Sequence, residues 1–164
     1  MAQSYTVPLR TVVEEQGFTL LHTSEDYDQA QVGTADLNRP GLQLAGYYDY
    51  FDPHRIQIIG CVETTYMERF SAYDRRAMFE AFMKHPIAGL VICHGMDPFP
   101  ECMEMAEKYD RNVFLSREDT SKLMARLIAS LSTHLAPRIT IHGVLVEIFG
   151  EGVLITGDSG VGKS

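Results

Sequence analysis

Along the first 130 or so residues of this chain, segments with apolar residues at helical spacing follow short segments with the composition of strands. Behind Thr6, a suitable N-cap, leucine and valine recur at helical spacing, and Gly17 predicts the end of that helix. Residues 18–22 then have the composition of a strand. The segment 23–36 is polar and receives no assignment, and residues 38–41 form a turn signal.

The middle of the chain repeats a strand-then-helix order. Residues 55–60 are short and rich in β-branched side chains, which predicts a buried strand. Residues 88–93 are a nearly continuous apolar run, which is typical of a strand buried on both faces of a parallel sheet. Residues 112–115 predict another short strand. The predicted helices cover residues 42–51, 63–84 with a break near Ser71, 98–109 and 119–134, the last with Leu123, Leu127, Ile128 and Leu131 on one face. The pattern predicts an N-terminal α/β domain with a mostly parallel sheet.

The pattern changes after Ala136-Pro137. A residue before proline is pushed out of the helical region, so the last helix should end there and a domain boundary is expected, dividing the chain into 1–135 and 136–164. Two strands are predicted behind it, over 138–149 and 152–156, joined by a Gly150-Glu151 turn. This hairpin runs directly into a glycine-rich loop.

The loop has the spacing of a phosphate-binding P-loop. Its glycines let the backbone curl so that several N–H groups converge on a polyphosphate. Lys163 would place its charge on the β and γ phosphates, and Ser164 would give its hydroxyl to Mg²⁺. The candidate nucleotide-binding residues are Gly157, Asp158, Ser159, Gly160, Val161, Gly162, Lys163 and Ser164. The start of a truncated P-loop kinase domain that uses ATP and Mg²⁺ is therefore predicted for 136–164.

His142 is a second candidate. If Gly150 and Glu151 are the two central turn residues, His142 lies opposite position 159, inside the loop and beside the phosphates. The alternative is a structural histidine, since a slip of the register by a residue or two would move the ring. The pairing argument alone leaves both interpretations open.

Composition and charge exclude several classes of function. The 45% hydrophobic and 22% charged residues are ordinary for a globular domain, and the net charge of −8 offers no basic field for nucleic acid or an anionic membrane surface. No apolar run reaches the ~18 residues of a spanning helix. The three cysteines lack metal-ligand spacing, so we expect buried, reduced thiols and a cytoplasmic protein.

The sequence resembles the bacterial HPr kinase/phosphorylase family over nearly its whole length. The resemblance lies in the segment 136–146, which includes His142-Gly143, followed by 152–164 with the P-loop. Upstream, the segments 38–42, 46–51 and 55–60, together with Glu63, fit the family in the same order. The strand pair leading into the loop distinguishes this family from ordinary P-loop enzymes.

The resemblance implies a Mg²⁺-dependent kinase that uses ATP, and also pyrophosphate, to phosphorylate a serine of the phosphocarrier HPr in the sugar phosphotransferase system. It also implies the reverse phosphorolysis, in which inorganic phosphate takes the phosphoryl group and pyrophosphate forms, and a role in carbon catabolite repression and sugar uptake. By the same resemblance His142 and Lys163 are active-site residues, Ser164 is a magnesium ligand, and the assembly is a homo-hexamer.

The sequence departs from the family pattern by stopping at Ser164, before the helix, the acidic general base and the second metal ligand that should follow. The 164-residue chain itself is therefore expected to be inactive. Two alternatives remain: a P-loop kinase of a small molecule, and a non-catalytic oligomerising or regulatory module.

Overall fold

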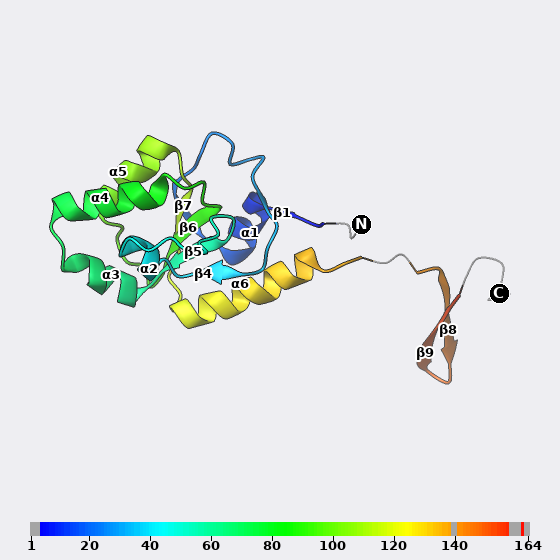
Figure 1. Ribbon diagram of the computed structural model, residues 1–164. Helices are drawn as coiled ribbons and strands as arrows, with labels where there is room; N and C mark the ends of the chain where they lie inside the picture. The colour runs from blue at the N-terminus through cyan, green and yellow to red at the C-terminus, as the bar shows by residue number, and fades with distance from the viewer. Residues whose placement is uncertain (1–3, 139–140, 158–161, 163–164) are drawn as a thin grey trace.

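The computed structural model describes residues 4–138, 141–157 and 162. Its main feature is a five-stranded sheet in the order β2-β7-β6-β5-β4 (Figure 1). The pairs β4·β5, β5·β6 and β6·β7 are parallel, and β2 adds to β7 in the antiparallel sense. The strands of this sheet are β2 (Thr19–His22), β4 (Leu37–Asn38), β5 (Ile56–Ile59), β6 (Gly89–Ile92) and β7 (Val113–Leu115). The predicted α/β fold with a mostly parallel sheet is confirmed.

Helices cover both faces of this sheet, and each has its own apolar core. The helices are α1 (Leu9–Gln16), α2 (Gly41–Leu44), α3 (Cys61–Glu68), α4 (Ala72–Met83), α5 (Pro100–Tyr109) and α6 (Thr120–Leu135). Side chains of α1 and α6 pack against Ile58, Val91 and Phe114, whereas α2 to α5 pack against Ile59 and Ile92. The strands β5 and β6 are fully buried because consecutive side chains enter opposite cores.

Helix ends follow local signals where the sequence supplies them. Gly17 ends α1 in the left-handed conformation, and Ser71 caps α4 by accepting a hydrogen bond from the backbone N of Asp74 at 3.2 Å. Helix α6 ends at Leu135, with Ala136 already extended before Pro137. The predicted break near Ser71 and the predicted end of α6 are confirmed.

Other expectations are corrected. Helix α1 begins at Leu9 rather than behind Thr6, and the expected helix over 42–51 is wrong beyond Leu44. Ile128 is 42% exposed and does not share the buried face of α6, because the buried positions 120, 123, 127 and 131 follow a narrower stripe. The unassigned segment 23–36 contains β3 (Gln31–Val32), which pairs with β1 (Val7–Pro8).

The three cysteines differ in environment, and the expectation that all are buried is wrong. Cys93 and Cys102 are buried, but Cys61 is exposed at the first position of α3. All three are free thiols. Burial raises the pKa of the Cys102 thiol to about 12 and also raises the pKa of Cys93.

These environments predict site-selective thiol chemistry. One thiol per chain, Cys61, should react rapidly with Ellman's reagent at pH 8, because only an accessible thiolate attacks the disulfide of the reagent. Cys93 and Cys102 should react only as fast as the chain unfolds. A Cys61→Ser variant should leave no rapid phase, and a rapid phase that persists in it would contradict this assignment of burial.

Candidate nucleotide-binding site

A β-hairpin precedes the P-loop. Its strands β8 (Gly143–Ile148) and β9 (Glu151–Thr156) pair antiparallel, from Gly143 opposite Thr156 to Ile148 opposite Glu151. The two residues between them, Phe149 and Gly150, have φ angles of 51° and 81°. Positive φ at both central residues matches the right-handed twist of the strands, as in a type I′ turn.

This turn corrects the predicted register. The central residues are Phe149-Gly150 and not Gly150-Glu151, so His142 lies opposite Gly157 instead of position 159. The backbone N of Gly157 donates to the carbonyl O of His142 at 3.3 Å, which continues the ladder by one pair. A non-glycine residue at positive φ is uncommon, so residue type alone does not predict Phe149 at this position.

The hairpin therefore brings His142 to the first residue of the glycine-rich loop. Gly143 next to it allows the strands to approach closely, because a Cβ at this position would lie 2.7 Å from the carbonyl O of Ile155. Gly162, near the far end of the loop, has a φ of 78°, which L side chains rarely adopt. The candidate residues Asp158, Ser159, Gly160, Val161, Lys163 and Ser164 lie outside the described residues.

Apolar side chains are exposed on the hairpin. Leu145 and Leu154 face each other across the strands and are 72% and 60% exposed, and every residue of β9 is exposed. Strands with apolar side chains on both faces are normally covered on both faces. A two-stranded hairpin of this kind is marginally stable in water without further strands or a helix packed on it.

A second polar group lies where the parallel strands end. The buried carboxylate of Glu63, 5% exposed, accepts hydrogen bonds from the backbone N of Gly60 and from Arg39 Nη2, both at 2.8 Å. A Cβ on Gly60 would collide with Thr120 Oγ1 and lie 3.3 Å from Arg39 Nη2, so a larger residue would displace the side chains packed between β5 and α6. These contacts join the ends of β4 and β5 to the start of α3.

His94 also lies at this edge of the sheet and is not among the candidate residues predicted from the sequence. Its Nε2 lies 3.2 Å from Thr120 Oγ1, and its Nδ1 lies 3.6 Å from Asp119 Oδ1. Its position directly after the predicted strand 88–93 was the signal available, since carboxyl ends of parallel strands meet at one edge. Among the residues that the structure describes, no group of three or more His, Cys, Asp or Glu side chains is placed to hold a metal ion.

Comparison with known proteins decides the family. The family profile for the HPr Serine kinase N terminus matches residues 7–131, and the profile for the HPr Serine kinase C-terminal domain matches residues 133–164. The chain belongs to the HPr kinase family. The resemblance drawn from the P-loop block and the upstream segments is confirmed.

Relatives within the HPr kinase family match most of this chain. An HPr kinase/phosphorylase of Alkaliphilus metalliredigens is 47% identical over 133 residues, which are 81% of this chain and 43% of the relative. One from Lachnoclostridium phytofermentans is 40% identical over 160 residues, 98% of this chain and 52% of the relative. The chain thus spans about half the length of the curated relatives it matches.

A solved structure outside the HPr kinase family shares the fold. The CBS and DRTGG domains of the regulatory region of Clostridium perfringens pyrophosphatase match with a TM-score of 0.54, over 78% of this chain and 50% of that one. The sequence identity is 14%, so the likeness concerns the fold alone. No helix among the residues described here is both long and apolar enough to cross a membrane.

Proposed function

We propose that this chain is the N-terminal part of an ATP- and Mg²⁺-dependent enzyme that phosphorylates a serine of HPr and also catalyses the reverse phosphorolysis. The observation that carries the proposal is the Gly157-to-Ser164 sequence directly behind a hairpin strand, in a chain that matches both HPr kinase profiles. Fold alone would not support a function, but a phosphate-binding loop of this spacing does.

Each proposed site residue has a distinct role. Backbone N–H groups of residues 157–162 cradle the phosphates, and Lys163 neutralises the charge that develops on them during transfer. Ser164 would hold Mg²⁺ through its hydroxyl, and the metal would supply positive charge against the charge that develops on the phosphates. We infer that the ring of His142 contacts a phosphoryl group, and the hydrogen bond from the backbone N of Gly157 to the carbonyl O of His142 supports this inference.

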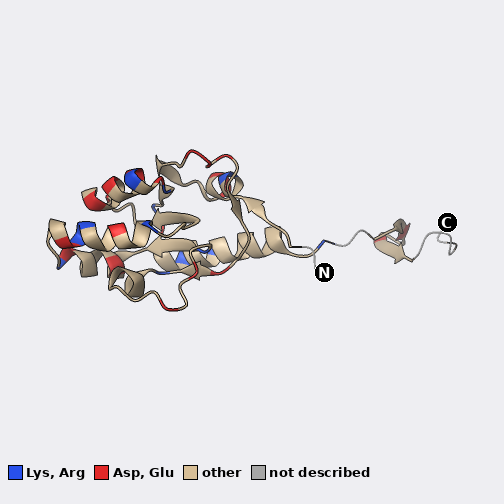
Figure 2. Cartoon of the chain, turned by 45° about the horizontal axis from the view of Figure 1, so that its top comes forward, with Lys and Arg blue, Asp and Glu red and all other residues tan. Residues whose placement is uncertain are grey.

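The same proposal covers partners and organisation. We infer a boundary between an N-terminal domain, 1–135, and the first part of a kinase domain, 136–164, with a homo-hexamer as the working assembly and HPr as the protein substrate. Acidic and basic residues are mixed over the helices (Figure 2), and the net charge is −8, which supports a protein that binds neither nucleic acid nor membranes. The three free cysteines support a cytoplasmic location.

Two alternatives differ in class. A P-loop kinase of a small molecule would share the loop, whereas a non-catalytic oligomerising module would use only the α/β part. An assay with purified HPr distinguishes the proposed function from both alternatives. The complete protein should transfer the γ-phosphate of radiolabelled Mg-ATP to HPr, and transfer should be lost when the acceptor serine of HPr is replaced by alanine. Failure to label HPr would overturn the proposal.

His142→Ala in the complete protein should slow phosphorylation and phosphorolysis by about 10²-fold, because a group beside the reacting phosphate stabilises charge mainly in the transition state. Mg-ATP binding should persist, since the loop backbone supplies most of the contacts. Single-turnover rates and nucleotide titration separate the two effects. His54→Ala, an exposed histidine of the N-terminal unit, is the matched control, and equal rates for both variants would make His142 structural.

The 164-residue chain alone should bind Mg-ATP weakly, with no affinity tighter than about 1 mM. Loop amides bind phosphate well only when neighbouring structure fixes their direction, and β9 is exposed along its whole length. Calorimetric titration with Mg-ATP measures this directly. Micromolar affinity would show that the hairpin alone preorganises the loop.

A further inference from the structure

Gly143 begins strand β8 and lies opposite Thr156 in the hairpin. A Cβ at this position would lie 2.7 Å from the carbonyl O of Ile155, 3.2 Å from Leu154 Cδ1 and 3.4 Å from Thr156 Cγ2. The contact with Ile155 decides, because a Cβ does not approach another atom closer than about 3.0 Å and a backbone oxygen cannot turn aside as the end of a side chain can. Any side chain at position 143 would therefore move β8 relative to β9.

The ladder places Gly143 at a pair of closely spaced residues. In antiparallel strands, pairs that exchange backbone hydrogen bonds have Cα atoms about 5.5 Å apart, and they alternate with unbonded pairs about 4.5 Å apart. The next pair is bonded, since the backbone N of Gly157 donates to the carbonyl O of His142. Gly143 and Thr156 therefore form a pair of the closer kind, directly beside the pair that joins His142 to the loop.

The hydrogen bond between Gly157 and His142 has little room to lengthen. Its N···O distance is 3.3 Å, and a contact of about 3.6 Å is no longer a hydrogen bond. A Cβ at position 143 would have to retreat from 2.7 Å to at least about 3.0 Å from the carbonyl O of Ile155. The same displacement at the next pair would break the bond that holds His142 beside Gly157.

The side chain of His142 takes no part in this contact. Consecutive side chains of a strand point to opposite faces, so Gly143 shares its face with Leu145, and His142 lies on the other face. A substitution at Gly143 would therefore reach His142 only through the backbone. Gly152 of the same hairpin differs, because a Cβ there would meet only Leu145 Cδ1, at an ordinary distance of 3.8 Å.

We propose that Gly143 is a positioning residue, which keeps the backbone of His142 bonded to Gly157 and thereby sets the distance between the His142 side chain and the phosphate-binding loop. This rests on the proposed role of His142 in phosphoryl transfer. Displacing a reacting group by about 1 Å can cost about 10²-fold in rate. Alanine at position 143 should therefore slow transfer, although it removes no group that contacts the phosphates.

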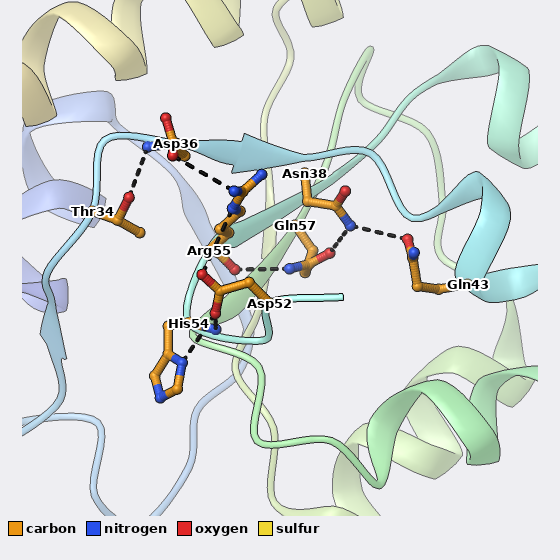
Figure 3. Close-up of polar contacts among 8 residues, drawn as sticks. All are labelled: Thr34, Asp36, Asn38, Gln43, Asp52, His54, Arg55 and Gln57. Carbon is orange, nitrogen blue, oxygen red and sulfur yellow. Dashed lines mark hydrogen bonds and ion pairs between the residues drawn. The ribbon is translucent and has the colours of Figure 1, made fainter. Parts of the chain in front are cut away.

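The test is a double-mutant cycle in the complete protein, measured as single-turnover transfer of the γ-phosphate from saturating Mg-ATP to HPr. Gly143→Ala should slow transfer at least about tenfold and keep the Mg-ATP affinity within about twofold. In the His142→Ala background it should slow transfer less than about twofold further, because it acts through His142. In the His54→Ala background it should keep its full effect, since His54 is an exposed histidine of the N-terminal unit, paired with Asp52 (Figure 3).

Gly152→Ala is the matched control, because it adds the same methyl group to the same hairpin where there is room for it. It should leave the transfer rate and the Mg-ATP affinity unchanged within about twofold. Three results would each overturn the proposal: an equal loss in Gly152→Ala, a full additional loss of Gly143→Ala in the His142→Ala background, and a loss of folding or Mg-ATP binding in Gly143→Ala. The last would show a general role in folding.

Hydrogen exchange at the amide of Gly157 tests the same geometry without HPr. In the complete protein this amide should exchange at least about tenfold faster in Gly143→Ala than in the wild type, and at an unchanged rate in Gly152→Ala. An unchanged rate in Gly143→Ala would overturn the positioning role. A wild-type protein that does not label HPr would instead contradict the proposed kinase function, and the exchange rates would still decide whether Gly143 holds His142 against Gly157.

Discussion

Lys163→Ala in the complete protein is expected to reduce HPr phosphorylation and its reversal by at least about 10³-fold. One ammonium group serves the phosphates in both reactions, because the phosphoryl group passes to or from a phosphate oxygen of ADP or of inorganic phosphate in the same loop. Radiolabelled transfer to HPr and phosphorolysis of phosphorylated HPr are measured with the same enzyme preparation.

Lys122→Ala is the control for this substitution, since Lys122 is an exposed lysine of α6 with 76% of its side chain accessible. It should leave both rates unchanged. If Lys163→Ala retained normal turnover, the P-loop assignment and the proposed kinase function would both be wrong.

Glu63→Ala is expected to destabilise the N-terminal unit by about 3 kcal/mol. The substitution leaves the backbone N of the buried Gly60 and the guanidinium of Arg39 without their shared acceptor. Arg39 is 37% exposed and regains some water, so the effect lies at the low end for a broken buried pair. Urea unfolding followed by circular dichroism gives the free energy of unfolding.

Glu68→Ala is the matched control on the same helix, because Glu68 is exposed. It should change the free energy of unfolding by less than about 0.5 kcal/mol. An equal loss in both variants would mean that helix propensity or net charge, and not the Glu63 contacts, stabilises this end of the sheet.

Local patterns predicted the elements that have strong local causes. The apolar runs of β5 and β6 require burial on both faces, and α4, α5 and α6 carry caps or proline at their ends. The strands β1, β3 and β4 have two residues each and were missed, because only pairing with a partner strand defines so short an element. The hairpin was predicted, but its turn was placed one residue too late.

The sequence by itself determined the α/β class and the family and contains the P-loop motif, since each depends on residue types at fixed spacing along the chain. Tertiary structure alone decided the hairpin register, which places His142 opposite Gly157 instead of opposite position 159. It also decided that Cys61 is exposed. It also decided the contact of Glu63 with Arg39 and that of Asn112 with Ser24, which joins residues 88 positions apart. Spacing along a chain does not predict contacts between residues far apart in the sequence, because these contacts follow from how strands and helices pack.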